Sequence, residues 1–176
     1  MTYQGMEEDR RFILSSADEL DQYLSSGTLL WRLGGINLPL TPGNLLFSRL
    51  RIGVNADDQV DSALQRITSM VKDRRSAWEK KISKEIPLRL NQWRNLVEEF
   101  HRNGGLDASY SYNIRVRVIL ELITTELEHD FLDVDRKLDE LDSVVMNLSQ
   151  PGRFIWDEEL EKYLPRDRYP YLYVKE

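Results

Sequence analysis

The 176 residues suffice for one ordinary domain with its own hydrophobic core, and a second independent core is not expected at this length. With 41% hydrophobic and 31% charged residues, the chain is too apolar to be intrinsically disordered. Its net charge of −6 argues against general affinity for nucleic-acid phosphates, and the absence of cysteine excludes disulfides, thiol catalysis and Cys-ligated zinc. We therefore expect a single domain, residues 1–176, in the reducing cytoplasm.

Neither export nor membrane insertion is predicted. The first ten residues are acidic and lack the basic start and apolar core of a secretory signal. The longest uncharged stretch, residues 33–48, contains proline and glycine and falls short of the ~20 apolar residues that a spanning helix requires. We expect no membrane partner.

A cap of short helices and loops is expected over residues 12–54. Ser16 and Glu19 match the capping-box pattern, which predicts a helix from about residue 17 to 26. Residues 28–40 are apolar but interrupted by glycine and proline, so we expect an ordered loop there.

The end of this cap contains the candidate small-molecule pocket. Thr41 followed by Pro42 predicts the start of a second short helix. Between Trp31 and Phe47, a glycine-containing apolar loop could shape a concavity for a ligand. The alternative, which we favour, is that this segment covers the apolar stripe of the helices that follow.

From residue 57 to 103 the apolar residues recur at helical spacings of three, four or seven. This pattern predicts one long helix or two nearly coaxial ones. Pro87 interrupts it, and because proline removes a backbone hydrogen bond and clashes with the preceding turn, we expect a kink or a break there.

A second long helix is predicted from residue 107 to 148, although residues 110–118 also alternate as a strand does. Its apolar residues alternate spacings of four and three, which is typical of a coiled-coil seam. The interface candidates on this seam are Leu127, Phe131, Val134, Leu138, Leu141 and Val145. Residues 151–176 form an aromatic tail.

The predicted fold is therefore mainly α: residues 57–148 form a long antiparallel hairpin, kinked near Pro87, between the cap and the tail. Residues 72–94 contain eight basic and three acidic side chains, and residues 120–142 contain nine acidic and two basic ones. A hairpin turning near Gly105 brings these segments together, so we expect a charge zipper. The alternative is nucleic-acid binding through Arg74, Arg75, Lys80, Lys81 and Lys84.

Both histidines of the chain close a Glu-x-x-His pattern, formed by Glu98 with His101 and by Glu126 with His129. Paired motifs of this kind hold di-iron or dimanganese centres in helical bundles. In the hairpin the two motifs would lie roughly 20 Å apart, so they could share a metal only across a dimer. Both also face away from the apolar stripes, and we expect no metal or cofactor.

No nucleophile elbow, phosphate loop or dinucleotide fingerprint is present, and we assign no catalytic residue. Helices of this length exceed what a compact domain needs, which favours packing against a second copy. The sequence therefore favours a non-enzymatic interaction or scaffold protein that forms a homodimer and binds a protein partner. The alternatives are a metal-dependent enzyme with its site across the dimer and a nucleic-acid-associated protein.

Overall fold

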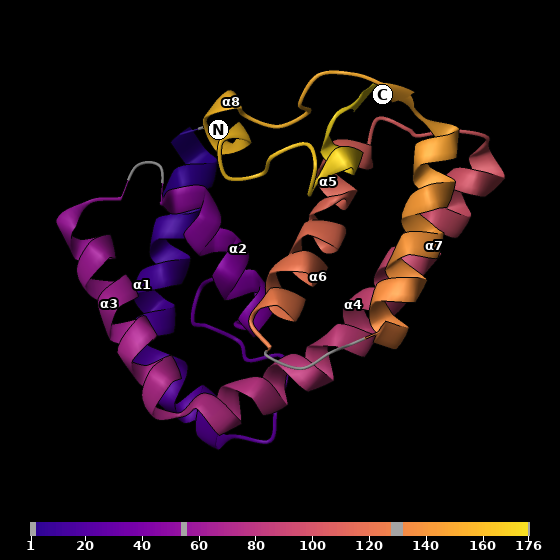
Figure 1. Ribbon diagram of the computed structural model, residues 1–176. Coiled ribbons are helices and arrows are strands. Elements are labelled where there is room, and N and C mark those ends of the chain that lie inside the picture. Colours follow the sequence, from indigo (N-terminus) through magenta and orange to yellow (C-terminus); the bar gives the residue numbers. More distant parts are fainter. Residues whose placement is uncertain (1–2, 54–55, 128–131, 176) are drawn as a thin grey trace. The chain divides into compact units, whose positions relative to one another are not determined.

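The computed structural model describes residues 3–53, 56–127 and 132–175. These residues are mainly helical, with one two-stranded sheet, so the mainly α prediction is confirmed (Figure 1). The chain packs as two compact units, Met1–Ile86 and Pro87–Glu176, and each is described by itself. The prediction of a single domain stays a prediction.

The first unit is built on a long N-terminal helix. Its helices are α1 (Tyr3–Ser25), α2 (Pro42–Ile52), α3 (Asp58–Asp73) and the beginning of α4 (Arg75–Asn103). Helix α1 packs against both α2 and α3. The fully buried side chains of this core include Phe12, Ile13, Leu20, Tyr23, Leu40, Trp78 and Ile82.

Helix α1 begins at Tyr3 and not near residue 17, so the predicted capping box at Ser16 is wrong. Ser16 is completely buried in the middle of α1. Together with Asp9, it lies on the same stripe as the apolar core residues Phe12 and Leu20, at helical spacing. Because these two positions are polar, the apolar periodicity of the sequence did not reveal the buried face of α1.

Of the two alternatives expected for residues 57–103, one long helix or two helices, the structure has two. Helix α3 ends at Asp73, and Arg74 leaves the helical conformation with φ −116° and ψ 35°. The Arg74 guanidinium holds this turn because its Nη1 lies 2.5 Å from an Asp21 carboxylate oxygen and 2.9 Å from Ser25 Oγ. Helix α4 then continues through Pro87, so the proline does not break the helix.

The second unit contains the remainder of α4 and the rest of the chain. Its elements are α5 (Tyr110–Asn113), α6 (Arg115–Thr125), α7 (Leu132–Leu148), β1 (Gln150–Pro151), α8 (Glu158–Glu161), η1 (Pro170–Leu172) and β2 (Val174–Lys175). The core includes Trp93, Phe100, Tyr110, Ile114, Val118, Ile123, Leu138, Val145 and Tyr171.

The predicted helix over 107–148 is also interrupted, and this overturns the antiparallel hairpin. Helix α6 ends at Thr125 and helix resumes at Leu132, so the chain reverses once more and α7 runs parallel to α4 (Figure 1). The Thr124 and Thr125 hydroxyls donate to carbonyls of the preceding turn, which is typical of residues that compete with helix continuation. The strand-like pattern at 110–118 is helical, as favoured.

The aromatic tail closes the second unit through the short β1–β2 pairing, in which Pro151 lies opposite Val174. Tyr169, Tyr171 and Tyr173 are all buried, and the Tyr110 hydroxyl donates to the Tyr171 carbonyl at 2.7 Å. The tail therefore belongs to the core of this unit.

Gly152 is the residue that permits this close pairing. A Cβ at this position would lie 2.7 Å from the Lys175 nitrogen and closer still to the Val174 carbonyl, and backbone atoms cannot swing aside as a side chain can. We expect Gly152→Ala to lower the free energy of unfolding by about 1–3 kcal/mol, the usual cost of overpacking. Urea denaturation measures this effect, with Gly105→Ala as a control in open space. Equal stabilities of the two variants would contradict the close approach.

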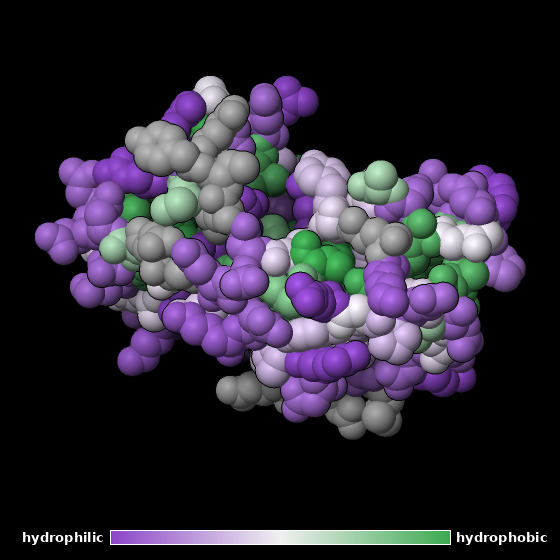
Figure 2. Space-filling model, turned by 90° about the horizontal axis from the view of Figure 1, so that it is seen from above, coloured by the Kyte–Doolittle hydropathy of each residue, from purple (hydrophilic) through white to green (hydrophobic). Residues whose placement is uncertain are grey.

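The face of the molecule shown in Figure 2 is largely hydrophilic, with small separate hydrophobic patches. Isolated exposed apolar side chains are normal for a globular protein. In the described part of the chain, no helix combines the length and the apolar character needed to cross a membrane.

Candidate functional site

Two buried polar networks and an open groove are the candidate sites in the described residues. The first network surrounds Glu85, whose side chain is fully buried in the first unit. Its carboxylate accepts hydrogen bonds from the Thr41 hydroxyl at 2.7 Å and from the Gly43 amide at 2.8 Å. Thr41 Oγ1 also accepts from the Asn44 amide, so the two side chains together cap the start of α2. This network is structural.

Two cations of the basic segment before Pro87, Arg74 and Lys81, are likewise engaged in structural contacts, whereas Lys80 and Lys84 are exposed. Lys81 is only 4% exposed, donates to the Ser26 and Thr28 carbonyls and lies 4.1 Å from the centre of the Tyr23 ring. Burial lowers the pKa of Lys81 and raises that of Tyr23. Because Arg74 also pairs with Asp21, these two cations are not available to a nucleic acid.

The second network centres on Arg117 in the second unit. Its guanidinium, 8% exposed, lies 2.8 Å from Asp142 and 3.0 Å from Glu121, with the Tyr171 ring centre 4.8 Å away. Trp93 Nε1 donates to the other Asp142 oxygen at 3.0 Å. Helices α4, α6 and α7 and the tail are thus joined around one buried cation. Two of the nine acids of the predicted charge zipper, Glu121 and Asp142, pair here with Arg117.

Burial sets the proton affinities of this network. It raises the pKa of Asp142, although Arg117 and the Trp93 hydrogen bond partly oppose the effect. Burial also raises the pKa of the Tyr171 hydroxyl well above its usual value. Burial alone would lower the pKa of Arg117, but Tyr171, Asp142 and Glu121 together raise it. Arg117 therefore stays charged, as its role as the centre of this network requires.

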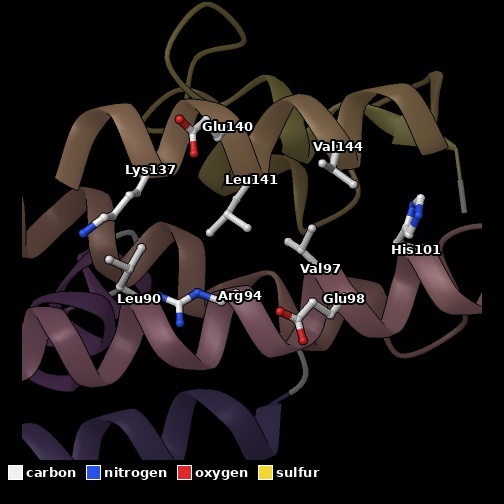
Figure 3. Close-up of a pocket in the computed structure, with 9 residues that line it drawn as sticks. All are labelled: Leu90, Arg94, Val97, Glu98, His101, Lys137, Glu140, Leu141 and Val144. Atoms are coloured by element: carbon white, nitrogen blue, oxygen red, sulfur yellow. The ribbon is translucent and has the colours of Figure 1, made fainter. Parts of the chain in front are cut away.

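The open feature is a groove between the second half of α4 and α7, with a volume of about 460 Å³ (Figure 3). The residues that line it are Leu90, Arg94, Val97, Glu98 and His101 of α4 and Lys137, Glu140, Leu141 and Val144 of α7. The spacings on α7 are three, four and seven residues, so these side chains share one helical face. The groove is hereafter called the α4–α7 groove.

Apolar side chains form the floor of the α4–α7 groove and charged ones its rims. Leu90 and Val97 are buried at its base, whereas Leu141 and Val144 of α7 are half-buried and face the opening. Figure 3 shows the side chains of both helices in the same order from left to right, as parallel helices require. An apolar floor between two charged rims is typical of a site that receives an amphipathic helix.

The rim charges have a regular order. On each helix a cation precedes a carboxylate: Arg94 precedes Glu98 on α4, and Lys137 precedes Glu140 on α7. Within the residues that the structure describes, Arg94, Glu98 and Glu140 form no ion pair. Lys137 has only a long contact of 3.8 Å to the exposed carboxylate of Asp133. These groups are free to meet a partner.

The structure describes one of the two Glu-x-x-His motifs completely. Glu98 and His101 are exposed on the rim of the α4–α7 groove, and Glu126 follows the end of α6. His129 lies outside the described residues. Over the described ranges, no three histidine, aspartate or glutamate side chains are grouped as metal ligands would be.

The predicted interface seam divides into two sets. Leu127, Leu138 and Val145 are buried within the second unit, whereas Val134 and Leu141 are half-buried. Phe131 lies outside the described residues. Only Leu141 of the seam lines the α4–α7 groove, and the sequence reasoning missed its groove neighbours Val144, Lys137 and Glu140. Their spacing on α7 was the signal that could have revealed this second stripe.

The two pocket candidates make contacts within the first unit. Trp31 donates from Nε1 to Glu19 at 2.6 Å and packs edge-on against Tyr23, and its backbone pairs with Leu40. Phe47 is 9% exposed, with the Arg51 guanidinium 5.7 Å from its ring centre. Neither residue lines the α4–α7 groove.

Comparison of the chain with protein-family models, with curated proteins and with solved structures found no match. The geometry of the α4–α7 groove is therefore the basis for a function.

Proposed function

We propose that this protein is a non-enzymatic helical interaction protein that binds an amphipathic helix in the α4–α7 groove. The supporting observation is the open apolar floor of Leu90, Val97, Leu141 and Val144 between two charged rims. The polar networks in the interior, in contrast, are occupied by structural contacts. The absence of cysteine supports a reducing compartment, and we place this function in the cytoplasm.

The parallel order of the rim charges gives the groove a polarity. A bound helix whose cations precede its carboxylates finds opposite charges on both rims when it runs antiparallel to α4 and α7, and a helix with the reverse order finds them when it runs parallel. Charge therefore selects direction, and the apolar floor supplies the affinity. Rim pairs that stay exposed contribute little energy individually but discriminate between orientations.

Two fluorescein-labelled peptides test this proposal. Each is a designed 14-residue amphipathic helix with leucines on one face and the same numbers of flanking Lys and Glu residues. In one peptide all the Lys residues precede the Glu residues, and in the other the two kinds are mixed along the helix. We expect the peptide whose Lys residues precede its Glu residues to bind at least about five-fold more tightly, because all its charges pair when it lies antiparallel to α4, whereas the mixed order pairs only part of them in either direction. Fluorescence anisotropy of the labelled peptide at nanomolar concentration, titrated with the protein, measures both affinities.

Leu141→Glu is expected to weaken the binding of the preferred peptide at least about ten-fold, because it places a carboxylate on the apolar floor. Ser143→Glu is the matched control, since Ser143 is exposed on the same helix and does not line the groove. Equal binding by both variants, or no binding of either peptide to the unaltered protein, would overturn the proposal. Far-UV circular dichroism verifies that the variants are folded.

A further inference from the structure

We infer that the helix received by the α4–α7 groove is α7 of a second copy, arranged antiparallel about a two-fold axis near Leu141. This inference rests on the proposed function and names its partner. Helix α7 is both a wall of the groove and an amphipathic helix in its own right.

Helix α7 carries two apolar stripes. Leu138 and Val145 are 3% and 0% exposed and pack into the unit to which they belong. Leu141 and Val144, on the side of the groove, are only half-buried. A helix with a second, uncovered stripe meets the requirement for a ligand of an apolar groove. Two copies of such a surface can cover each other.

The register of α4 and α7 is fixed by their lining residues. In Figure 3 Leu90 lies beside Lys137, Arg94 near Leu141 and Val97 near Val144, and the residue numbers of each pair differ by 47. The hydrogen bond from Trp93 to Asp142 agrees with this register to within two residues. Lys137 therefore lies towards one end of the groove and Glu98 towards the other, with Arg94 and Glu140 at the middle (Figure 3).

This order of charges is self-complementary under a two-fold axis. With Leu141 on the axis, Lys137 of the second copy lies at the level of Val145 and hence of Glu98. Glu140 of the second copy then lies within one residue of the level of Arg94. By symmetry each contact forms twice, so four pairs of opposite charge surround the contact of Leu141 with itself. A parallel arrangement would instead place Lys137 of one copy at the level of Lys137 of the other.

Charge exchange tests this arrangement, with the dimer dissociation constant measured by sedimentation equilibrium at low salt. We expect Lys137→Glu to raise this constant at least about ten-fold, because it faces Glu98 of the other copy. The double variant Lys137→Glu with Glu98→Lys should return to within about three-fold of the unaltered protein, since the pair is restored with its signs exchanged. Glu99→Lys is the control, because Glu99 is the neighbour of Glu98 on α4 but does not line the groove. It should change the dimer dissociation constant less than three-fold.

Cysteine cross-linking tests the position of the axis without background, because the chain contains no cysteine. Leu141→Cys should form a disulfide-linked dimer on mild oxidation, and Ser143→Cys should not. A monomer at all concentrations overturns the inference, and so does a dimer that shows neither the charge exchange nor the Leu141→Cys cross-link. If the protein stays monomeric but binds the peptide, the inference fails and the proposed function stands. If it neither dimerises nor binds the peptide, the groove is not a binding site.

Discussion

Replacing Arg117 with methionine is expected to lower the free energy of unfolding by about 3–5 kcal/mol, because removal of one partner from a buried ion pair leaves an uncompensated charge. Asp142 and Glu121 both lie within 3.0 Å of the Arg117 guanidinium. Methionine fills much of the same volume, so the loss reports on charge rather than on a cavity. Urea denaturation at pH 7, followed by circular dichroism, measures it.

Two further variants separate the ion pair from general disturbance of α6. Arg115→Met removes a cation two residues away, whose guanidinium lies over the Tyr112 ring at 3.8 Å, and should cost less than about 1 kcal/mol because that ring is exposed. Adding Asp142→Asn to Arg117→Met should recover about 1–2 kcal/mol, because the buried charge disappears while an oxygen remains for Trp93. A double variant less stable than Arg117→Met would contradict the ion-pair explanation.

Replacing Glu85 with alanine is the second change with a large expected effect, about 2–4 kcal/mol. The substitution removes the acceptor for the Thr41 hydroxyl and the Gly43 amide, and each buried donor left unpaired costs roughly 1–3 kcal/mol. Thermal and urea unfolding should both show the loss. Glu85→Gln should lose less, because its single carbonyl oxygen still accepts one of these hydrogen bonds.

Lys84→Ala is the matched control for this experiment, because Lys84 is the exposed neighbour of Glu85 on α4. We expect it to change stability by less than about 0.5 kcal/mol. Thr41→Val removes one of the donors, so its effect should not add to that of Glu85→Ala. Full additivity of the two losses would show that Glu85 does not act through Thr41.

The apolar periodicity of the sequence predicted the buried face of α4 well. Trp78, Ile82, Trp93, Val97 and Phe100 are all buried, because burial of a helix face depends chiefly on spacing, which a sequence displays directly. Mainly helical architecture follows from the same local patterns.

The ends of the helices were predicted poorly, because contacts between distant residues determine them. The turn at Arg74 depends on Asp21, more than 50 residues away in sequence, and no local pattern marks it. The interior position of Ser16 in α1 was hidden because a hydroxyl at a core position resembles an N-cap. An error at one helix end also changes the predicted direction of the next helix. Because the interruption after Thr125 was not predicted, residues 132–148 were expected to run antiparallel to α4.

The α4–α7 groove shows the same limit for function. Leu141 was predicted as an interface residue, but Leu138 and Val145 on the same seam are buried inside the unit. Spacing alone cannot separate the stripe that packs internally from the one left open. That distinction required the direction of α7 relative to α4, which the sequence pattern did not contain.

The hydrogen bond between Tyr110 and Tyr171 joins residues 61 positions apart, and this separation has a consequence for synthesis. At about 5–20 residues per second, Tyr171 follows Tyr110 from the ribosome by roughly 3–12 seconds. During that interval α6 and α7 exist without the tail that covers their apolar faces. The core of the second unit is therefore completed only after the tail has been translated.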